Sequence, residues 1–351
     1  IEINLSSLEI LSEAETPPFE IVENSNVKEE KRLTNRYLDL RRPDMQRAIA
    51  LRHKVAKVTR DYFDDNGFFE IETPMLTKST PEGARDYLVP SRIHKGSFYA
   101  LPQSPQLYKQ ALVAVYERVF EIAPVFRAEH HDTSRHLNEY ISMDFEMGFI
   151  DSFEDIMNME TGVLKYIMNL LKTEYANEVE LLHADIPEIN EVPVMKFMDA
   201  KELLMTKFKY KPSDMKDFDP AEEELLGKYA KKEFNSDFIF ITHYPSKKRP
   251  FYTMDDPTDP EYTLSFDLLF RGLEITSGGQ RVHDYNMQVE KMKAMGGDPE
   301  QFETYLMLHK YGAPPHGGLG IGLERLTMHL LGFKNVREAT MFPRDINRVS
   351  P

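Results

Sequence analysis

The sequence contains no cysteine, which excludes disulfide bonds and thiolate metal sites in this chain. It also has no apolar run that approaches the roughly 20 residues needed by a membrane-spanning helix. The N-terminal stretch, IEINLSSLEI, lacks a basic region followed by an apolar one, so no secretory signal is visible. These absences favour a cytoplasmic protein with no membrane segment.

Positive charge is in the minority, since 43 Lys and Arg residues stand against 58 Asp and Glu residues, a formal net charge of −15. A protein that coats nucleic acid is usually basic overall. Any contact with RNA must therefore use local basic patches on an acidic body. Apolar residues make up 41% of the 351 residues, which is enough for a sizeable core in one large or two smaller domains.

The first 45 residues are predicted to be a remnant and a connector. Residues 1–22 predict a short strand and a loop, too short for a domain of their own. They resemble the end of a unit that lies upstream. Residues 23–45 are rich in charge and predict a linker.

An amphipathic helix and a strand follow the connector. Leu51, Val55, Val58 and Tyr62 recur at spacings that form the apolar stripe of a helix. Gly67 is suited to its C-terminal cap. The next residues, FFEIET, predict a strand that ends at a proline.

Residues 118–149 predict two strands around a polar loop, HHDTSRHLN. The second strand alternates between an apolar face, which we expect in the core, and a polar face. Exposure to solvent is the usual explanation of a polar face. Arg127 and Glu129 of the first strand share its parity, however, and such a paired surface is more typical of the floor of a site. The polar face carries Tyr140, Ser142, Asp144 and Glu146.

Residues 151–235 predict mostly helices, are acidic, and suggest no chemistry. Residues 263–276 predict a hairpin with Arg271 and Gly272 at its turn. In that register Glu274 lies opposite Leu269 and on the same face as Asp267. Two neighbouring carboxylates on a strand are either an exposed polar face or a divalent cation site, since Mg²⁺ takes a few carboxylates and phosphate oxygens.

The glycines of GLGIGLER, residues 318–325, alternate with the period of a strand, so all three face one side. Glycine weakens a strand unless something approaches the backbone closely. We expect a nucleotide to be that neighbour. No Gly-Lys-Ser/Thr follows the glycines, which excludes a P-loop. Glu324 and Arg325 then open a helix with a core-facing stripe, and Gly332 ends it.

Three of these stretches resemble, in order, the three motifs of class II aminoacyl-tRNA synthetases. They are GFFEIETPML (67–76), FRAEHHDTSRHLNEYISMDFEM (126–147) and GLGIGLER (318–325). Within the class the segments RYLDLRRPDMQ, TPEGARDYLVPSR, LPQSPQLYKQ, RPFYTM, SGGQRVHD and MFPRD are similar to those of aspartyl-tRNA synthetases. The resemblance covers residues from about 23 to 351.

The resemblance implies an α+β catalytic domain over residues 46–351, with an antiparallel sheet flanked by helices. It also implies a homodimer through the helix and strand of residues 46–76. Family members carry an N-terminal OB-fold anticodon-binding domain. Residues 1–22 would be its remnant and residues 23–45 the linker, which puts anticodon reading in doubt but not the catalytic core.

The activity that the resemblance implies is ligation of L-aspartate to tRNA. ATP first activates the amino acid to aspartyl-adenylate, and the acyl group then moves to the 3′ end of tRNA. The tRNA for aspartate is the expected partner, and charging of the tRNA for asparagine stays open. By the same resemblance, Arg127 and Arg325 are catalytic, the ATP-binding residues are Arg127, Glu129, His136, Tyr140, Glu274, Gly322 and Arg325, and Asp267, Glu274 and Ser277 bind Mg²⁺.

The stretch QSPQLYKQ carries the substrate prediction. Ser104 is suited to cap a helix with Pro105 as its first residue. Gln106 and Lys109 then share one face. A lysine on a helix is usually a solvated surface group, but the resemblance pairs Lys109 with the β-carboxylate of aspartate. It implies the full aspartate-binding set Glu82, Ser104, Gln106, Lys109, Asp144, Tyr252, Ser277 and Arg281.

Three alternatives stay open. An asparaginyl-tRNA synthetase is the nearest by fold, and Lys109 speaks against it because an asparagine amide would leave buried cations without a counter-charge. A paralogue without an anticodon domain that makes aspartyl-adenylate for amide synthesis would keep every activation residue. A non-catalytic relative would be expected to lose motif arginines, yet Arg127 and Arg325 are present.

Overall fold

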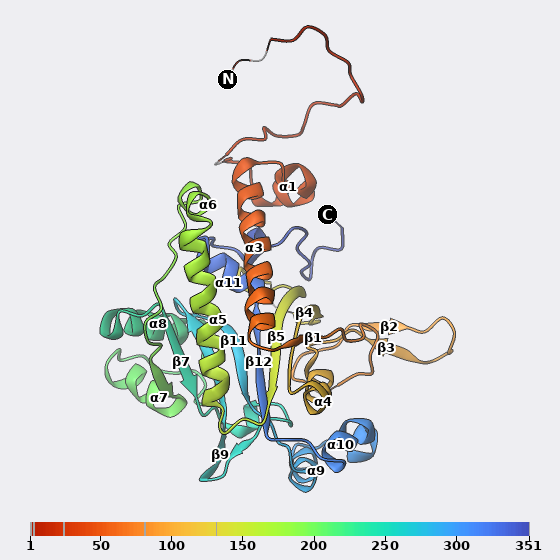
Figure 1. The fold of residues 1–351 in the computed structure, drawn as a ribbon, viewed down its shortest axis with the longest axis vertical. Coiled ribbons are helices and arrows are strands. Elements are labelled where there is room, and N and C mark those ends of the chain that lie inside the picture. The colour runs from red at the N-terminus through yellow and green to blue at the C-terminus, as the bar shows by residue number, and fades with distance from the viewer. Residues whose placement is uncertain (1, 3, 24, 81, 131, 351) are drawn as a thin grey trace.

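An eight-stranded mixed sheet forms the centre of the computed structural model, which describes residues 2, 4–23, 25–80, 82–130 and 132–350 (Figure 1). The strand order is β1-β4-β5-β12-β11-β10-β7-β6. The six central strands pair antiparallel, as expected, whereas both edge strands join parallel. The strands of this sheet are β1 (Phe69–Glu70), β4 (Arg118–Phe126), β5 (Glu139–Gly148), β6 (Val194–Lys196), β7 (Phe238–Thr242), β10 (Ser265–Phe270), β11 (Leu273–Gln280) and β12 (His316–Gly322).

Three helices cover one face of the sheet and bury the main core. They are α3 (Pro43–Asp65), α5 (Glu154–Thr173) and α11 (Leu323–Leu330), and Figure 1 shows α3 and α5 side by side across the strands. The predicted stripe of α3 is confirmed, because Leu51, Val55 and Val58 are buried in this core. Gly67 and Gly332 follow α3 and α11 with positive φ, as expected of C-terminal caps. Met143 and Phe145 of β5 meet these helices, so the polar side chains of β5 face the opposite way.

The acidic segment forms α5, α6 (Ala176–Leu181), β6, α7 (Phe197–Thr206) and α8 (Pro220–Phe234). Helices α7 and α8 pack on β7 and β10 around Ile239, Ile241 and Leu269. Lys201 of α7 and Glu222 of α8 form a salt bridge with both side chains wholly buried. Removing one partner of such a pair leaves an uncompensated charge, so this pair holds the two helices together.

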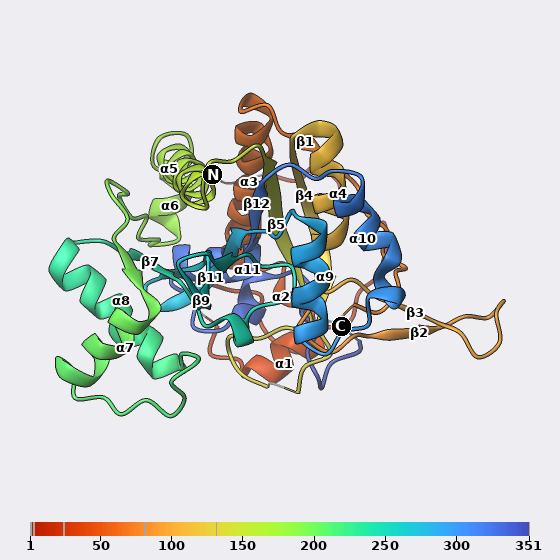
Figure 2. The same cartoon turned by 90° about the horizontal axis from the view of Figure 1, so that it is seen from below.

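The remaining elements surround the sheet on its other sides (Figure 2). The β2–β3 hairpin projects from the body in both views. Helices α9 and α10 pack against each other, and α10 also contacts α4. These elements are α4 (Gln106–Tyr116), α9 (Tyr285–Ala294), α10 (Glu303–Lys310), the strands β2 (Leu88–Pro90), β3 (Phe98–Ala100), β8 (Asp255–Asp256) and β9 (Asp259–Thr263), and the short 3₁₀ helices η1 (Ser246–Lys248), η2 (Pro299–Phe302) and η3 (Val336–Ala339).

The N-terminal segment differs from its prediction. The short strand expected in residues 1–22 does not form in the described residues 2 and 4–22. Residues 4–18 are exposed and run away from the body, whereas Phe19 is buried, and Ile1 and Ile3 lie outside the described residues. The connector is helical rather than a plain linker, with α1 (Glu29–Thr34) and α2 (Arg36–Asp39) leading into α3.

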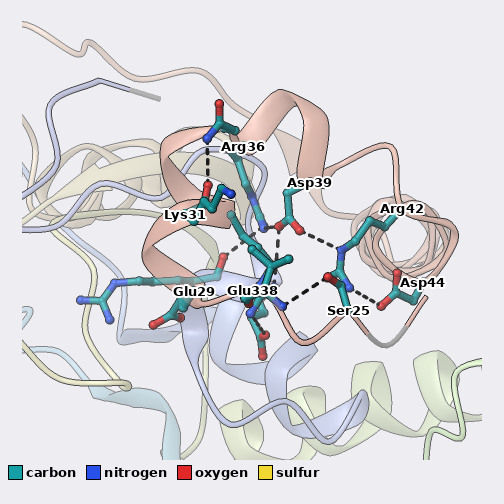
Figure 3. Close-up of polar contacts among 12 residues, drawn as sticks. Ser25, Glu29, Lys31, Arg36, Asp39, Arg42, Asp44 and Glu338 are labelled. Carbon is teal, nitrogen blue, oxygen red and sulfur yellow. Dashed lines mark hydrogen bonds and ion pairs between the residues drawn. The ribbon is translucent and has the colours of Figure 1, made fainter. Parts of the chain in front are cut away.

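A buried ionic cluster attaches this connector to the C-terminal segment (Figure 3). Asp39 is fully buried and accepts hydrogen bonds from Arg36 and Arg42 at 2.5 and 2.8 Å. Arg36 also donates to the backbone carbonyls of Thr340 and Met341 at 2.6 and 2.8 Å. The stretch RYLDLRR therefore packs as part of the main body of the fold.

The β10–β11 hairpin has the predicted turn, since Arg271 and Gly272 have positive φ and Leu269 lies opposite Glu274. The register then shifts between Leu268 and Leu269, because a bulge places one extra residue in β11. Strict alternation would put Glu274 and Ser277 on opposite faces. The bulge instead pairs Asp267 with Ser277 and brings all three side chains to the same face.

Candidate active site

A cavity of about 500 Å³ lies on the face of the sheet opposite α3 and α5. Strands β5, β11 and β12 supply its floor, and the loops after β1, β4 and β7 supply its walls. Every residue of the predicted site except Asp267 lines it. Those residues are Glu82, Ser104, Gln106, Lys109, Arg127, Glu129, His136, Tyr140, Asp144, Tyr252, Glu274, Ser277, Arg281, Gly322 and Arg325.

Two buried cations meet at one end of the cavity. Lys109 donates to Asp144 and to the Leu319 carbonyl, both at 2.9 Å, and its Nζ lies 3.4 Å from Glu146. Arg281 donates to Glu146 at 2.9 Å through Nε. Burial alone would raise the pKa of Glu146, but Arg281 and Lys109 hold it below its ordinary value. Glu146 is thus a charged link between the two cations.

Sequence reasoning placed Glu146 on the polar face of β5 but gave it no role. The signal that could have assigned it to the site was its position two residues after Asp144, on the same face of the strand. The structure adds that Glu146 has no solvent-exposed surface, which a sequence pattern cannot show.

Helix α4 delivers Gln106 and Lys109 to this end from one helical face, as predicted, and both side chains are buried rather than solvated. The expected cap is wrong. The helix begins at Gln106, Pro105 occupies the cap position, and no side chain caps the first turn. Gln106 accepts from Arg281 Nη2 at 3.2 Å, so the helix start is fixed by the site.

The loop that carries Glu82 is held by Gln103, a residue that sequence reasoning missed. The buried Gln103 amide accepts from Ala84 N at 2.9 Å and donates to Asp86 Oδ1 at 2.5 Å and to the Thr80 carbonyl at 3.3 Å. Burial raises the pKa of Glu82 to about 7, against the effect of Thr80 and Arg127. Pro81, in the same loop, lies outside the described residues.

Arginines gather at the other end of the cavity. Arg127 lies over the Tyr140 ring, with 5.4 Å between its Cζ and the ring centroid. Arg325 donates to the Glu274 carbonyl at 2.8 Å. Arg135, another residue without a predicted role, lines the cavity and is ion-paired with Glu223 of α8. The acidic helical segment therefore contacts the site through Glu223. His131, in the loop that carries Arg135, lies outside the described residues.

The predicted metal ligands lie together at this end. Burial, followed by the nearby Asp267 carboxylate, raises the pKa of Glu274 to about 7. Asp267 Oδ1 is buried and has no hydrogen-bond partner in the described part of the chain. Among the described residues, no group of three or more His, Asp or Glu side chains could hold a metal ion by itself. Two carboxylates and the Ser277 hydroxyl fit Mg²⁺, which keeps several waters and takes phosphate oxygens as further ligands.

Gly318, Gly320 and Gly322 of β12 share one side, as predicted, but the first two make room for neighbouring atoms of the protein itself. Gly318 and Gly320 lie opposite Glu146 and Asp144 of β5. A Cβ at 318 would overlap the Phe145 carbonyl oxygen and the Glu146 carboxylate, and one at 320 would lie 3.0 Å from Asp144 Oδ1. Only Gly322 has open space, with its nearest atom 3.8 Å away. A nucleotide is therefore the expected neighbour of Gly322 alone.

Helix α11 fixes the arginine that follows. Leu326 and Leu330 are buried in the main core, as predicted. Glu324 accepts from Arg52 of α3 at 2.6 Å and from the Ile141 N–H at 3.0 Å. Helix α3 is thereby hydrogen-bonded to Glu324, the residue that directly precedes Arg325.

The sheet topology, the three motifs and the charged cavity agree with the comparisons to known proteins. Residues 28–346 match the family model of class II tRNA synthetases (D, K and N). The chain therefore belongs to the class II tRNA synthetases of this group. None of the helices in the described residues is long and apolar enough to cross a membrane.

Relatives within the family carry a more particular name. The aspartate–tRNA(Asp/Asn) ligase of Aeropyrum pernix is 44% identical, and the alignment covers all of this chain and 80% of the relative. The aspartate–tRNA(Asp) ligase of Thermococcus kodakarensis is 40% identical with the same coverage. The solved aspartyl-tRNA synthetase of Entamoeba histolytica is 33% identical with a TM-score of 0.82. The structural alignment covers 94% of this chain and 64% of that structure.

Proposed function

We propose that the chain is an aspartate–tRNA ligase, which activates L-aspartate with ATP and transfers the aspartyl group to tRNA. The observation that carries the proposal is the pair of buried cations, Lys109 and Arg281, at one end of a cavity whose other end holds Arg127 and Arg325. A dicarboxylic amino acid and a triphosphate fit those two ends. The names of the relatives agree with this activity.

The amino-acid end would hold aspartate by charge. Lys109 and Arg281 would bind the β-carboxylate, with Tyr252 beside them. The bonds of Arg281 to protein use Nε and Nη2, and we assign Nη1 to the substrate. The remaining predicted ligands would hold the α-ammonium group, namely Glu82, Ser104, Gln106 and Asp144.

Discrimination against asparagine would come from hydrogen bonding to Lys109 and Arg281. The sequence predicted that a bound asparagine would leave two buried cations without a counter-charge. Asp144 and Glu146 already pair with Lys109 and Arg281, however, so neither cation would lack one. The β-carboxylate instead accepts charge-assisted hydrogen bonds from both cations, whereas an amide group offers one acceptor and two donors. Facing two cationic donors, the amide nitrogen has no partner.

The nucleotide end would position ATP and neutralise charge. A carboxylate is itself the nucleophile, so the first step needs orientation and charge stabilisation more than a base. Arg127 would hold the α-phosphate and stabilise the charge that develops there as the aspartate oxygen attacks. Arg325 would bind the γ-phosphate, and Tyr140 would stack on adenine with a contribution of about 1–3 kcal/mol. Glu129, His136 and Gly322 complete the nucleotide contacts.

Mg²⁺ would supply positive charge that lowers the repulsion between the phosphates of ATP. Asp267, Glu274 and Ser277 would hold it. We further propose that the enzyme acts on the tRNA for aspartate, that charging of the tRNA for asparagine depends on the anticodon-binding part, and that residues 1–22 come from that part. The helix and strand of residues 46–76 would form a homodimer interface.

The direct test is pyrophosphate exchange with aspartate and with asparagine, followed by charging of both tRNAs. We expect exchange with aspartate and little with asparagine. Exchange with neither amino acid would reject the proposal. Exchange with aspartate but no charging of any tRNA would favour the amide-forming paralogue.

Glu82 predicts the pH dependence of aspartate binding. Its carboxyl, with a pKa of about 7, must be ionised to hold the ammonium group. Above pH 7 the free enzyme is ready to bind, and below it kcat/KM for aspartate should fall by about tenfold per pH unit. The Glu82→Gln variant should lose this part of the dependence, and what remains would report Glu274. An unchanged profile in that variant would contradict the assignment.

Substitutions of Gly322 and Gly318 are expected to have contrasting effects. Gly322→Val should fold, because a Cβ there meets nothing closer than 3.8 Å, and should raise KM for ATP by filling space at the nucleotide end. Gly318→Ala should destabilise the chain by about 1–3 kcal/mol through overpacking against β5. Thermal unfolding and ATP titration measure the two effects. Normal ATP affinity in Gly322→Val would remove the nucleotide from this part of the strand.

A further inference from the structure

Arg249 occupies the position expected of the metal. Its Nη2 lies 2.8 Å from Asp267 Oδ2, and its Nη1 donates to Ser277 Oγ at 2.9 Å. Asp267 and Ser277 are two of the three residues assigned above to Mg²⁺. Sequence reasoning gave Arg249 no role.

The guanidinium group is held there from two further directions. It lies over the Tyr244 ring, with 3.9 Å between Cζ and the ring centroid. The preceding residue, Lys248, is ion-paired with Asp214 and Asp217 in the loop between α7 and α8. That loop is fixed in turn by the buried Lys201, which donates to the Asp214 and Asp217 carbonyls at 2.8 and 2.6 Å.

A guanidinium and a divalent cation compete for the same oxygen atoms. Each takes carboxylate lone pairs, and their like charges repel strongly at the short separation that sharing Asp267 would require. Arg249 therefore neutralises part of the charge of Asp267. A metal ion must displace Arg249 to reach both Asp267 and Ser277.

We propose that Arg249 is a built-in counter-ion that keeps divalent cations from binding tightly before ATP arrives. The phosphates of ATP supply the metal with further oxygen ligands, and they offer the displaced guanidinium a new anionic partner. Metal and nucleotide would then bind together rather than in succession. This inference rests on the proposed function, because the metal site is assigned through it.

Binding of Mn²⁺ without nucleotide tests the proposal, with free Mn²⁺ measured by its electron paramagnetic resonance signal. Arg249→Gln should bind Mn²⁺ about tenfold more tightly than the unmodified chain, a difference of about 1.4 kcal/mol. Lys247→Gln is the matched control, since Lys247 lines the same cavity and the substitution removes the same charge. It should change the affinity by at most about twofold, because its charge acts through solvent.

Two further variants make the test decisive. Arg249→Gln combined with Asp267→Asn should lose the gain, which places the Mn²⁺ at Asp267. Arg249→Lys keeps the charge but not the fork that reaches both oxygens, so it should show an intermediate affinity even if Arg249→Gln fails to fold.

Equal Mn²⁺ affinity in the unmodified chain, Arg249→Gln and Arg249→Lys would overturn the proposal, as would a gain that survives Asp267→Asn. Aspartate-dependent pyrophosphate exchange by the unmodified chain separates this failure from failure of the proposed function. If exchange is present and the Mn²⁺ affinities are equal, only the role of Arg249 is wrong.

Discussion

Lys109→Leu is expected to lower kcat/KM for aspartate by about a hundredfold to several thousandfold. The substitution removes one of two cations that would bind the β-carboxylate, and losing a buried charge pair costs about 3–5 kcal/mol, at about 1.36 kcal/mol per tenfold. Affinity for ATP should change little, because Lys109 lies at the amino-acid end. Pyrophosphate exchange over a range of aspartate concentrations measures the loss.

The structure adds a loss of stability that the sequence did not indicate. Lys109 lies between Asp144 and Glu146, so its removal also leaves buried carboxylates with less compensation. Lys201→Leu is the matched control, since Lys201 is a helical lysine wholly buried against Glu222. It should destabilise the chain comparably while leaving kcat/KM near normal at low temperature. Equal loss of activity in both variants would reduce the role of Lys109 to folding.

Arg127→Gln is expected to reduce kcat for aspartate activation by about 10²- to 10³-fold, the usual effect of removing one preorganised donor from a developing charge. Arg127 is positioned by Tyr140, and its Nε is buried without a hydrogen-bond partner in the described residues. A phosphate oxygen would satisfy that donor. KM for ATP should rise much less than kcat falls, because the interaction strengthens in the transition state.

Arg118→Gln is the control for this variant. Arg118 begins the same strand, β4, and is exposed at its far end. Its substitution should leave kcat within about twofold, as is usual for surface changes. A uniform rise in KM with unchanged kcat in Arg127→Gln would mean that Arg127 only binds ATP.

Much of the site could be predicted because strand parity is a local property. Alternation along β5 placed Tyr140, Ser142 and Asp144 on one face, and the core-facing Met143 and Phe145 confirm it. The prediction that Gln106 and Lys109 share one helical face was correct for the same reason. In both cases a period in the sequence translates directly into a direction in space.

Other features depend on contacts between distant segments and could not be predicted. The bulge in β11 brings Ser277 to the face of Asp267, and no signal in LEITSGG marks its position. Arg36, paired with Asp39, attaches the connector to the body through the distant carbonyls of Thr340 and Met341. The explanation of Gly318 likewise needed the cross-strand partner Glu146. Partner identity, rather than propensity, was the missing information.

The burial of Glu82 has a consequence for the calorimetry of this protein. Near pH 7 part of the free molecules carry a proton on Glu82, because burial raises its pKa to about 7. An ammonium group arriving beside this carboxyl stabilises its ionised form and lowers its pKa, so uptake of the amino acid expels part of a proton into the buffer. The apparent heat of binding should then vary with the ionisation enthalpy of the buffer, and the slope of that variation counts the protons that leave.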